Sequence, residues 1–335
     1  MVKFSASPSV NTAAAPHSTP TPVRVVQTTW HTPEVIGLSL QALDGRPLPG
    51  WQAGAHVDLH LPGELVRAYS LCGVPSAQPG RYDIAVKREP MGRGGSQAVH
   101  QLRAGSELQV GAPRNLFALA DEPCHHLLLG GGIGLTPLVA MAHTLHQQGR
   151  DFTLVVYARS RELLPLRTIL ENAAWRDRVH VHLDDAGHGT APSDWLARAP
   201  AGCHVYFCGP AGFMDHLREA ARHWPAPRVH FEYFGAPQAP AGTAETAAAS
   251  GFEVRLARQQ IAIQVAPDQS IAQALQAAGM AVDTVCEQGI CGSCVTPYLD
   301  GTPDHQDLCL SQEERASHLA LCCSRCTSSH LTLDL

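Results

Sequence analysis

The pattern of apolar positions changes twice along the chain. In residues 23–120, short alternating or β-branched runs are broken by Gly and Pro, at 23–28, 35–40, 56–61, 82–87 and 107–110. This pattern predicts an antiparallel β-barrel of short strands. In residues 121–234, apolar strand-like runs (126–129, 153–157, 179–183, 204–208) alternate with helical stretches (137–147, 163–172, 211–222). Such alternation predicts an α/β domain whose parallel sheet is covered by helices.

A third segment follows a change in composition. Residues 235–251 are rich in Ala, Gly, Pro and Thr and predict an interdomain linker. Residues 252–335 begin with two alternating runs, and a helix is predicted over 270–278 with Ser270 as its N-cap. Residues 1–22 are rich in Ser, Thr, Ala and Pro without an apolar stretch, which predicts a disordered tail and not a signal peptide.

Composition and charge narrow the class of protein. No run approaches the ~18 apolar residues of a membrane span, and no basic patch indicates nucleic-acid binding. The eleven cysteines form an odd set without a signal peptide, which favours a cytoplasmic protein over a secreted disulfide framework. Residues 251–335 hold ten acids and four bases and so carry the whole net charge of −6. This acidity fits a solvated surface or a face that docks on a positive partner.

Seven of the eleven cysteines lie between positions 286 and 326. Cys286, Cys291 and Cys294 are separated by four and then two residues, and Cys322 follows after 27 intervening residues. Four thiolates at this spacing are typical of a plant-type [2Fe–2S] cluster. Gly289 and Gly292 would let the loop turn tightly and bring N–H donors to the sulfurs.

Two alternatives remain open at the cysteines. The pairs Cys291–Cys294 and Cys323–Cys326 could form a zinc ribbon, although Cys286 would then have no role. The fourth cluster ligand could be Cys322, Cys323 or Cys326, and Cys309 comes early by spacing.

A Gly-rich stretch after the predicted strand 126–129 indicates a nucleotide site. It reads Gly-Gly-Gly-Ile-Gly-Leu-Thr-Pro over 130–137, which gives a pyrophosphate room against backbone amides. It is not the dinucleotide fingerprint, because Leu135 stands at the last glycine position. The next strand ends at Arg159, Ser160 and Arg161 instead of an acid. These arginines could accept a 2′-phosphate and favour NADPH, bind the pyrophosphate, or lie on the surface.

With these motifs, residues 23–335 resemble the phthalate dioxygenase reductase family. The resemblance implies a flavin barrel (23–120), a nicotinamide domain (121–234), a linker (235–251) and a C-terminal plant-type ferredoxin of β-grasp fold (252–335). The Leu-Cys-Cys-Ser-Arg step at 321–325 matches the family and makes Cys322 the fourth ligand, with Cys323 and Cys326 as bystanders.

The resemblance also implies the cofactor sites. The Arg-x-Tyr-Ser step at 67–70 would hold the flavin, since an Arg fork suits a phosphate and an aromatic ring suits the flavin face. The Gly-Arg-Gly-Gly-Ser turn at 92–96 favours FMN over FAD. Thr136 would lie near the flavin and Cys208 beside the nicotinamide, and these two are the predicted catalytic residues, with Cys208 as a positioning group and not a nucleophile. The cofactor-binding residues so predicted are Arg67, Tyr69, Ser70, Ala85, Val86, Lys87, Gly92, Arg93, Gly94, Gly95, Ser96, Gly131, Gly132, Gly134, Thr136, Arg159, Ser160, Cys208, Gly209, Pro210 and Phe234.

The implied activity is electron transfer from NADH through FMN to the cluster and on to a separate Rieske-type aromatic-ring oxygenase or demethylase. A haem-thiolate monooxygenase is a second possible acceptor. A third reading is a zinc-ribbon binding module on a flavoprotein scaffold. We expect a monomer.

Overall fold

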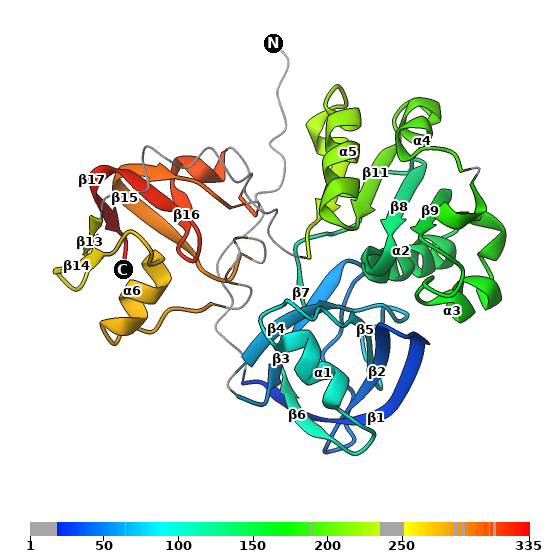
Figure 1. Cartoon of the computed structure of the whole chain (residues 1–335), viewed down its shortest axis with the longest axis horizontal. Coiled ribbons are helices and arrows are strands. Elements are labelled where there is room, and N and C mark those ends of the chain that lie inside the picture. Colours follow the sequence, from blue (N-terminus) through cyan, green and yellow to red (C-terminus); the bar gives the residue numbers. More distant parts are fainter. Residues whose placement is uncertain are drawn as a thin grey trace, which may run out of the picture.

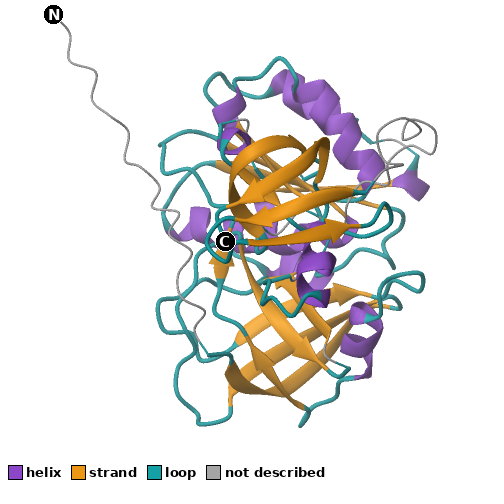
Figure 2. Ribbon diagram, turned by 90° about the vertical axis from the view of Figure 1, so that its left-hand side faces the viewer, coloured by secondary structure: helices purple, strands orange, loops and turns teal. Residues whose placement is uncertain are grey.

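The computed structural model contains three domains, coloured along the chain in Figure 1. It describes residues 19–63, 65–187, 189–234, 251–284, 287, 289, 292–307, 309–310 and 313–335. The barrel (blue to cyan) lies below the α/β domain (green) and the C-terminal domain (yellow to red). Their strands form three separate sheets. In the turned view of Figure 2, the strands of the barrel lie below those of the other two domains. None of the helices in these ranges has the length and apolar character that a membrane crossing requires.

The N-terminal domain is an antiparallel barrel-like sheet in the order β4-β3-β6-β1-β2-β5, with β7 paired to β3. Its elements are β1 (Thr21–Thr32), β2 (Val35–Ala42), β3 (Ala55–Leu61), β4 (Leu65–Ser70), β5 (Tyr82–Lys87), α1 (Gly95–Gln101), β6 (Glu107–Val110) and β7 (Arg114–Asn115). Each expected run is a strand. The first begins at Thr21, two residues before the expected boundary, because Thr21 pairs with Val110 of β6.

The second domain is a parallel sheet in the order β10-β9-β8-β11-β12. Its strands are β8 (His126–Gly131), β9 (Phe152–Ala158), β10 (Val179–Leu183), β11 (His204–Cys208) and β12 (Val229–Glu232), and its helices are α2 (Leu135–Gln147), α3 (Arg167–Asn172), α4 (Pro192–Arg198) and α5 (Ala211–Ala221). All six residues of β8 are buried, as a central parallel strand requires. The strand order reverses between β8 and β11, where the carboxyl ends of such sheets bind ligands.

Short 3₁₀ helices connect several of these elements. They are η1 (Gly132–Gly134), η2 (Arg176–Arg178), η3 (Asp184–Ala186), η4 (Ala226–Arg228) and, in the third domain, η5 (Glu314–Ala316). Two helices differ from the sequence prediction: α4 was not predicted, and α3 begins at Arg167 and not at residue 163. Pro165 disfavours helix before it, and Leu166 has φ of 55°, so the chain turns there before the helix starts.

The C-terminal domain is a mixed sheet in the order β14-β13-β17-β15-β16, with α6 packed against it. Its elements are β13 (Phe252–Leu256), β14 (Ile261–Val265), α6 (Ile271–Ala277), β15 (Val295–Asp304), β16 (His318–Ala320) and β17 (Arg325–Leu333). Ser270 caps α6 as expected: its Oγ accepts from the Gln273 N–H at 3.1 Å, and Gln273 Oε1 accepts from the Ser270 N–H at 2.9 Å. The three architectures confirm the predicted fold class.

The barrel shares one hydrophobic core with the α/β domain, which also has a second core of its own, and the C-terminal domain has a separate core. The shared core extends from barrel side chains such as Val23 to buried side chains of the α/β domain such as Tyr206, and the Phe117 and Tyr206 rings lie 5.8 Å apart across the boundary. The separate core extends from Phe252 to Leu333. The linker expected at 235–251 lies outside the described residues, except for Gly251.

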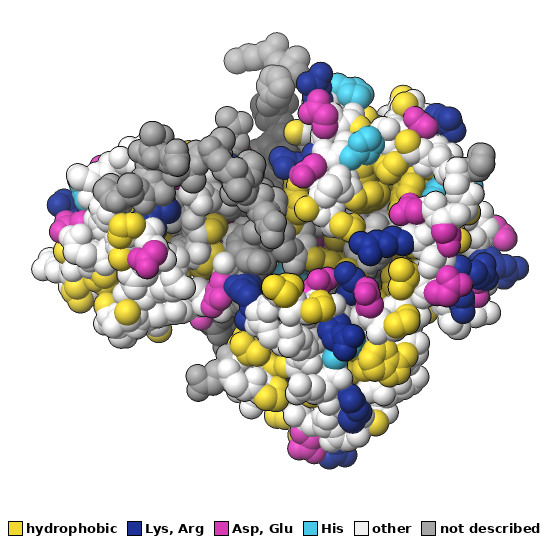
Figure 3. Space-filling view, in the orientation of Figure 1, with side chains coloured by type: hydrophobic (Ala, Val, Ile, Leu, Met, Phe, Trp, Pro, Cys, Tyr) yellow, Lys and Arg dark blue, Asp and Glu magenta, His cyan; other side chains and the backbone are white. Residues whose placement is uncertain are grey.

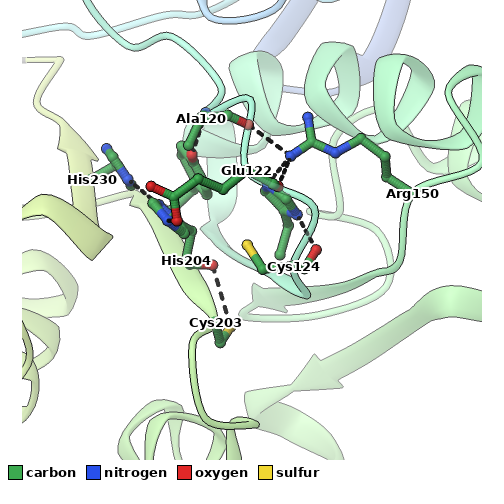
Figure 4. A network of polar contacts seen from close by, with 9 residues as sticks. Ala120, Glu122, Cys124, Arg150, Cys203, His204 and His230 are labelled. Carbon is green, nitrogen blue, oxygen red and sulfur yellow. Dashed lines mark hydrogen bonds and ion pairs between the residues drawn. The ribbon is translucent and has the colours of Figure 1, made fainter. Parts of the chain in front are cut away.

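The segment that leaves the barrel is anchored on the α/β domain by the polar network of Figure 4. The Ala120 N–H donates to the Tyr206 hydroxyl at 2.8 Å, and Arg150 donates to the Ala120 carbonyl at 2.7 Å. Glu122 lies 3.1 Å from His204, whose other ring nitrogen lies 2.9 Å from His230. These contacts hold the two domains in a fixed relation.

Candidate functional site

A cavity of about 1340 Å³ lies between the barrel and the α/β domain. Its lining comes from the ends of β4 and β5, the 92–96 turn, and the carboxyl ends of β8, β9 and β11. Pockets for one small ligand typically measure ~300–1,000 Å³, so this cavity has room for two ligands side by side. Lys and Arg side chains line the seam between the two domains on the face drawn in Figure 3, which suits phosphate-bearing ligands.

Arg67 and the glycine turn form one end of the cavity. A Cβ on Gly95 would lie 2.5 Å from Arg67 Cγ, so only glycine lets the arginine lie across the turn. Arg67 Nη2 donates to the Arg93 carbonyl at 3.1 Å. Gly94 has φ of 84°, a left-handed conformation that favours glycine. Ser96 lies inside α1, where its Oγ accepts from the Glu89 N–H at 3.0 Å. This cradle fits a flavin phosphate.

Apolar and aromatic side chains line the middle of the cavity. Tyr69 and Ser70 reach it from β4, and Ala85 and Val86 from β5. Burial raises the pKa of Tyr69 to about 12, so its hydroxyl remains a hydrogen-bond donor at neutral pH. A flat apolar slot with a few hydroxyl donors fits a flavin ring.

Two glycine turns pack against each other where β8 and β11 end. A Cβ on Gly131 would lie 2.9 Å from Pro210 Cδ, and one on Gly134 would lie 2.2 Å from the Cys208 carbonyl oxygen. Thr136, at the start of α2, lines the cavity and donates to the Ile133 carbonyl at 3.1 Å. The close packing of the two turns leaves room only for glycine at positions 131 and 134, which fits the close approach of a dinucleotide's pyrophosphate.

Cys208 is fully buried behind this surface, and Glu232 lies beside it. Burial raises the pKa of the Cys208 thiol well above its usual value, and the charge of Glu232 adds to the effect. The protonated thiol is suited to positioning and not to nucleophilic attack. Burial likewise raises the pKa of Glu232 to about 7, although a 3.1 Å hydrogen bond from Ser70 Oγ partly offsets it. Glu232 was not predicted from the sequence, and its place at the end of β12, the last strand of the sheet, was the available signal.

The far end of the cavity carries charges of both signs. Arg159 lines it at the end of β9, and Asp184 lines it at the end of β10. The Asp185 N–H donates to the Arg159 carbonyl at 3.1 Å, so the two strand ends are fixed side by side. Arg161 does not line the cavity and instead forms a 2.6 Å ion pair with Glu171. The sequence shows no acid at the end of β9, the strand that follows the glycine turn. The structure shows that Asp184, at the end of β10, supplies one.

The structure brings most of the predicted cofactor residues to this one cavity. Four of the predicted residues do not line it: Gly94, Gly134, Ser160 and Cys208. Gly94 and Gly134 shape the turns that do line it, and Cys208 lies directly behind them. Phe234 reaches the cavity with 43% of its surface exposed.

The cysteine-rich loop (residues 286–294, hereafter the cluster loop) belongs to the C-terminal domain. Cys294 and Cys322 are both buried there, at 5% and 8% exposure. The Gly289 N–H donates to Cys322 Sγ at 3.2 Å, and Gly289 and Gly292 have φ of 69° and 70°. Two buried thiols with an amide donor on one sulfur fit an iron–sulfur cluster. Cys286 and Cys291 lie outside the described residues.

The remaining cysteines of this domain have other surroundings. Cys326 lies in β17, with its sulfur 3.3 Å from the His330 carbonyl oxygen, and its bystander role stays a prediction. Cys323 lies behind Gly289, where a Cβ would be 2.4 Å from its sulfur. Cys309 lines the cavity, so the C-terminal domain also reaches it.

The domain order and sites define a class of three-domain reductases, and known proteins share them. Residues 254–327 match the family model of the 2Fe-2S iron-sulfur cluster binding domain. The chain is 42% identical over 309 residues to a vanillate O-demethylase oxidoreductase of Pseudomonas sp., covering 90% of this chain and 96% of the relative.

Solved structures agree. Phthalate dioxygenase reductase, described as a modular structure for electron transfer from pyridine nucleotides to [2Fe-2S], matches with a TM-score of 0.70 and 34% identity over 94% of this chain and 97% of that chain. An intact type IV self-sufficient cytochrome P450 monooxygenase matches with a TM-score of 0.83 and 35% identity over 94% of this chain, which spans only 41% of that protein. The chain belongs to the phthalate dioxygenase reductase family of oxygenase reductases, as the sequence predicted.

Proposed function

We propose that this protein is the NADH-dependent reductase component of a multicomponent oxygenase, with FMN and a plant-type [2Fe–2S] cluster as its cofactors. One observation carries the proposal: residues that line the cavity between the flavin-type barrel and the nucleotide-type sheet also contact the cluster loop. Leu116 lines the cavity and lies 3.7 Å from a Cβ built on Gly292, and Arg93 lines it and pairs with Glu287 at 2.8 Å. The three proposed sites would therefore meet at one place.

The residues divide among the three groups. Arg67, Arg93 and the backbone of the 92–96 turn would hold the FMN phosphate, and Tyr69 with Ser70, Ala85, Val86 and Lys87 would hold the ring. The turns at 131–136 and 208–210, with Phe234, would place the nicotinamide against it. Cys286, Cys291, Cys294 and Cys322 would bind the cluster. The domain boundaries at residues 22, 120, 234 and 251 are part of this proposal.

A bound flavin would accept two electrons as a hydride and release them one at a time, and a plant-type cluster carries one electron at a time. The chain's own residues orient the nicotinamide and adjust charge around it. Ionised Glu232 would stabilise the positive charge that grows on a nicotinamide as its hydride leaves. Ser70 fixes this carboxyl through their 3.1 Å hydrogen bond.

NADH is preferred over NADPH in this proposal because Asp184 lines the far end of the cavity beside Arg159. A carboxylate accepts a hydrogen bond from a ribose hydroxyl but repels a 2′-phosphate. With Arg161 paired to Glu171, Arg159 is the only one of the three residues at 159–161 that lines the cavity.

The electron acceptor proposed is a separate Rieske-type oxygenase or demethylase, in line with the vanillate O-demethylase oxidoreductase that the chain resembles over nearly its full length. A haem-thiolate acceptor is a second candidate, because the reductase part of a self-sufficient cytochrome P450 also matches.

A reconstitution experiment tests the proposal. The purified chain is assayed for flavin, iron and zinc and then mixed with NADH and either a Rieske oxygenase or a haem-thiolate monooxygenase. The proposal would be supported if the chain contains flavin and about two irons, and if NADH drives turnover of the Rieske enzyme but not of the haem-thiolate enzyme. Zinc without iron would refute it.

A further inference from the structure

Among the described residues of the cluster loop, two make polar contacts with the barrel, and both contacts use an arginine. Arg93 Nη1 lies 2.8 Å from Glu287 Oε2, and Arg114 Nη1 donates to Ser293 Oγ at 2.6 Å. Glu287 and Ser293 lie at the two ends of the loop that carries Cys291, and Ser293 directly precedes Cys294. We define these two contacts as the cluster junction.

Arg114 is held more firmly than Arg93. Both oxygens of Asp58 accept from Arg114 Nη2, at 2.9 and 2.7 Å. The Asp58 side chain is 14% exposed and that of Arg114 34%, whereas the Arg93 and Glu287 side chains are 39% and 51% exposed. A partly buried pair with two hydrogen bonds keeps its geometry, while an exposed ion pair contributes little.

The backbone under Arg114 is also fixed. Arg114 pairs with His56 of β3, and Asn115 pairs with Ala55. The Asn115 side chain donates to the Ala53 carbonyl at 2.9 Å and accepts from the Phe117 N–H at 3.1 Å. A Cβ on Gly54 would lie 1.9 Å from the Phe117 carbonyl oxygen, so the strands are in close contact. The guanidinium is therefore oriented before it meets Ser293.

Arg114 also stands in a row that crosses the barrel wall from one cofactor site to the next. His56 of β3 pairs with Ser70 on one side and with Arg114 on the other. Directly paired residues point to the same face of a sheet. Ser70 contacts Glu232 of the α/β domain, and Arg114 contacts Ser293 of the C-terminal domain.

The geometry points to Arg114 as a positioning residue that holds the cluster loop against the flavin barrel and so sets the rate at which the cluster is reduced. The inference rests on the proposed function. Arg114 takes part in no bond change; it fixes Ser293, and with it Cys294, relative to the cavity. Asp58 acts with it by orienting the guanidinium.

The test compares Ser293→Ala and Arg114→Gln in the full-length holoprotein. Ser293→Ala leaves the Arg114–Asp58 pair intact, so it keeps the test valid if Arg114→Gln weakens the barrel. Rapid mixing with NADH under anaerobic conditions follows flavin and cluster reduction separately, in the cluster-containing fraction. We expect cluster reduction to slow about tenfold in each variant, the effect of losing one charge-assisted hydrogen bond. Flavin reduction should keep its wild-type rate.

Two controls sharpen the result. The double variant should be no slower than Arg114→Gln alone, because both changes remove the same contact. Arg24→Gln removes an exposed arginine of β1 that pairs with Glu107 of β6, and this variant should behave as wild type.

Hydrogen exchange supplies a readout independent of electron transfer. The backbone amides of residues 292–296 should exchange faster in both variants than in the wild type. Unchanged cluster reduction and exchange would overturn the inference, as would equal slowing of the flavin and cluster steps. Absence of iron or of NADH-dependent flavin reduction in the wild type would instead refute the proposed function.

Discussion

The two contacts that the barrel makes with its neighbours are built differently. Toward the α/β domain the barrel shares a continuous apolar core, closed by the Phe117–Tyr206 contact and the Ser70–Glu232 hydrogen bond. We call this the nicotinamide junction. Toward the C-terminal domain, the cluster junction consists of polar contacts between separate cores. Hydride transfer needs the reacting atoms within about 3–3.5 Å, so its partners are best held by a shared core. A domain that delivers single electrons to another protein can be held by weaker polar contacts.

The largest effect should come from removing a cluster ligand. Cys294→Ser should abolish electron delivery beyond the flavin, while NADH still reduces the flavin, because the two cores are separate. The iron content measures the loss of the cluster, and NADH-driven reduction of an acceptor that takes electrons directly from the flavin measures flavin reduction. Cys326→Ala is the matched control and should keep its iron. Loss of flavin reduction in Cys294→Ser would show that the two junctions are not independent.

Next in size is the loss of the flavin phosphate contact. Arg67→Gln should raise the dissociation constant of FMN about 10- to 100-fold, since a charge-assisted hydrogen bond is lost. Titration of the flavin-free protein by fluorescence measures it, with Arg24→Gln as control. Unaltered FMN affinity would place the phosphate elsewhere in the cavity.

A smaller effect concerns the charge at the nicotinamide junction. Because the pKa of Glu232 is about 7, flavin reduction by NADH should accelerate several-fold between pH 6 and 8, as the carboxylate forms and stabilises the developing nicotinamide charge. Glu232→Gln should be slow and flat over this range, whereas the exposed Glu219→Gln should keep the wild-type profile. A Glu232→Gln profile that still rises would assign the titration to another group.

The selectivity between nucleotides should respond by a similar factor. Asp184→Ser should tighten NADP⁺ binding several-fold and weaken NAD⁺ binding slightly, because the repulsion toward a 2′-phosphate is removed. Equilibrium binding of the two nucleotides measures this, and the exposed Asp177→Ser serves as control. Equal affinities before and after the change would contradict the role of Asp184.

A further effect, on stability and not on a rate or an affinity, distinguishes the two cores. Burial lowers to about 4 the pKa of His56, in the barrel, and of His126, in the α/β domain. The unfolded chain binds these protons near pH 6.5 but the folded chain does not, so stability falls as the pH drops from about 6.5 to 4. The loss is on the order of 2 kcal/mol for each histidine. Calorimetry should show the transition of these two domains moving down in temperature more steeply with acid than that of the C-terminal domain.

The sequence predicted those parts that depend on local pattern. Strand and helix periodicity placed the domains, and Ser270 marked the start of α6 correctly. Cysteine spacing and glycine turns predicted cofactor sites, and most of the predicted flavin and nicotinamide residues line one cavity. Contacts between distant segments left no local signal: Glu232 meets Ser70 across 162 positions, and Arg114 meets Ser293 across 179. The left-handed turn at Leu166 likewise could not be predicted, because the apolar periodicity of residues 163–172 continues through it.

The most direct test of the account is an anaerobic titration of the full-length protein with NADH, followed by visible absorbance and electron paramagnetic resonance. The account predicts bleaching of the flavin bands together with the signal of a reduced [2Fe–2S] cluster, one per chain. A protein in which NADH reduces the flavin but no cluster signal ever develops would contradict it.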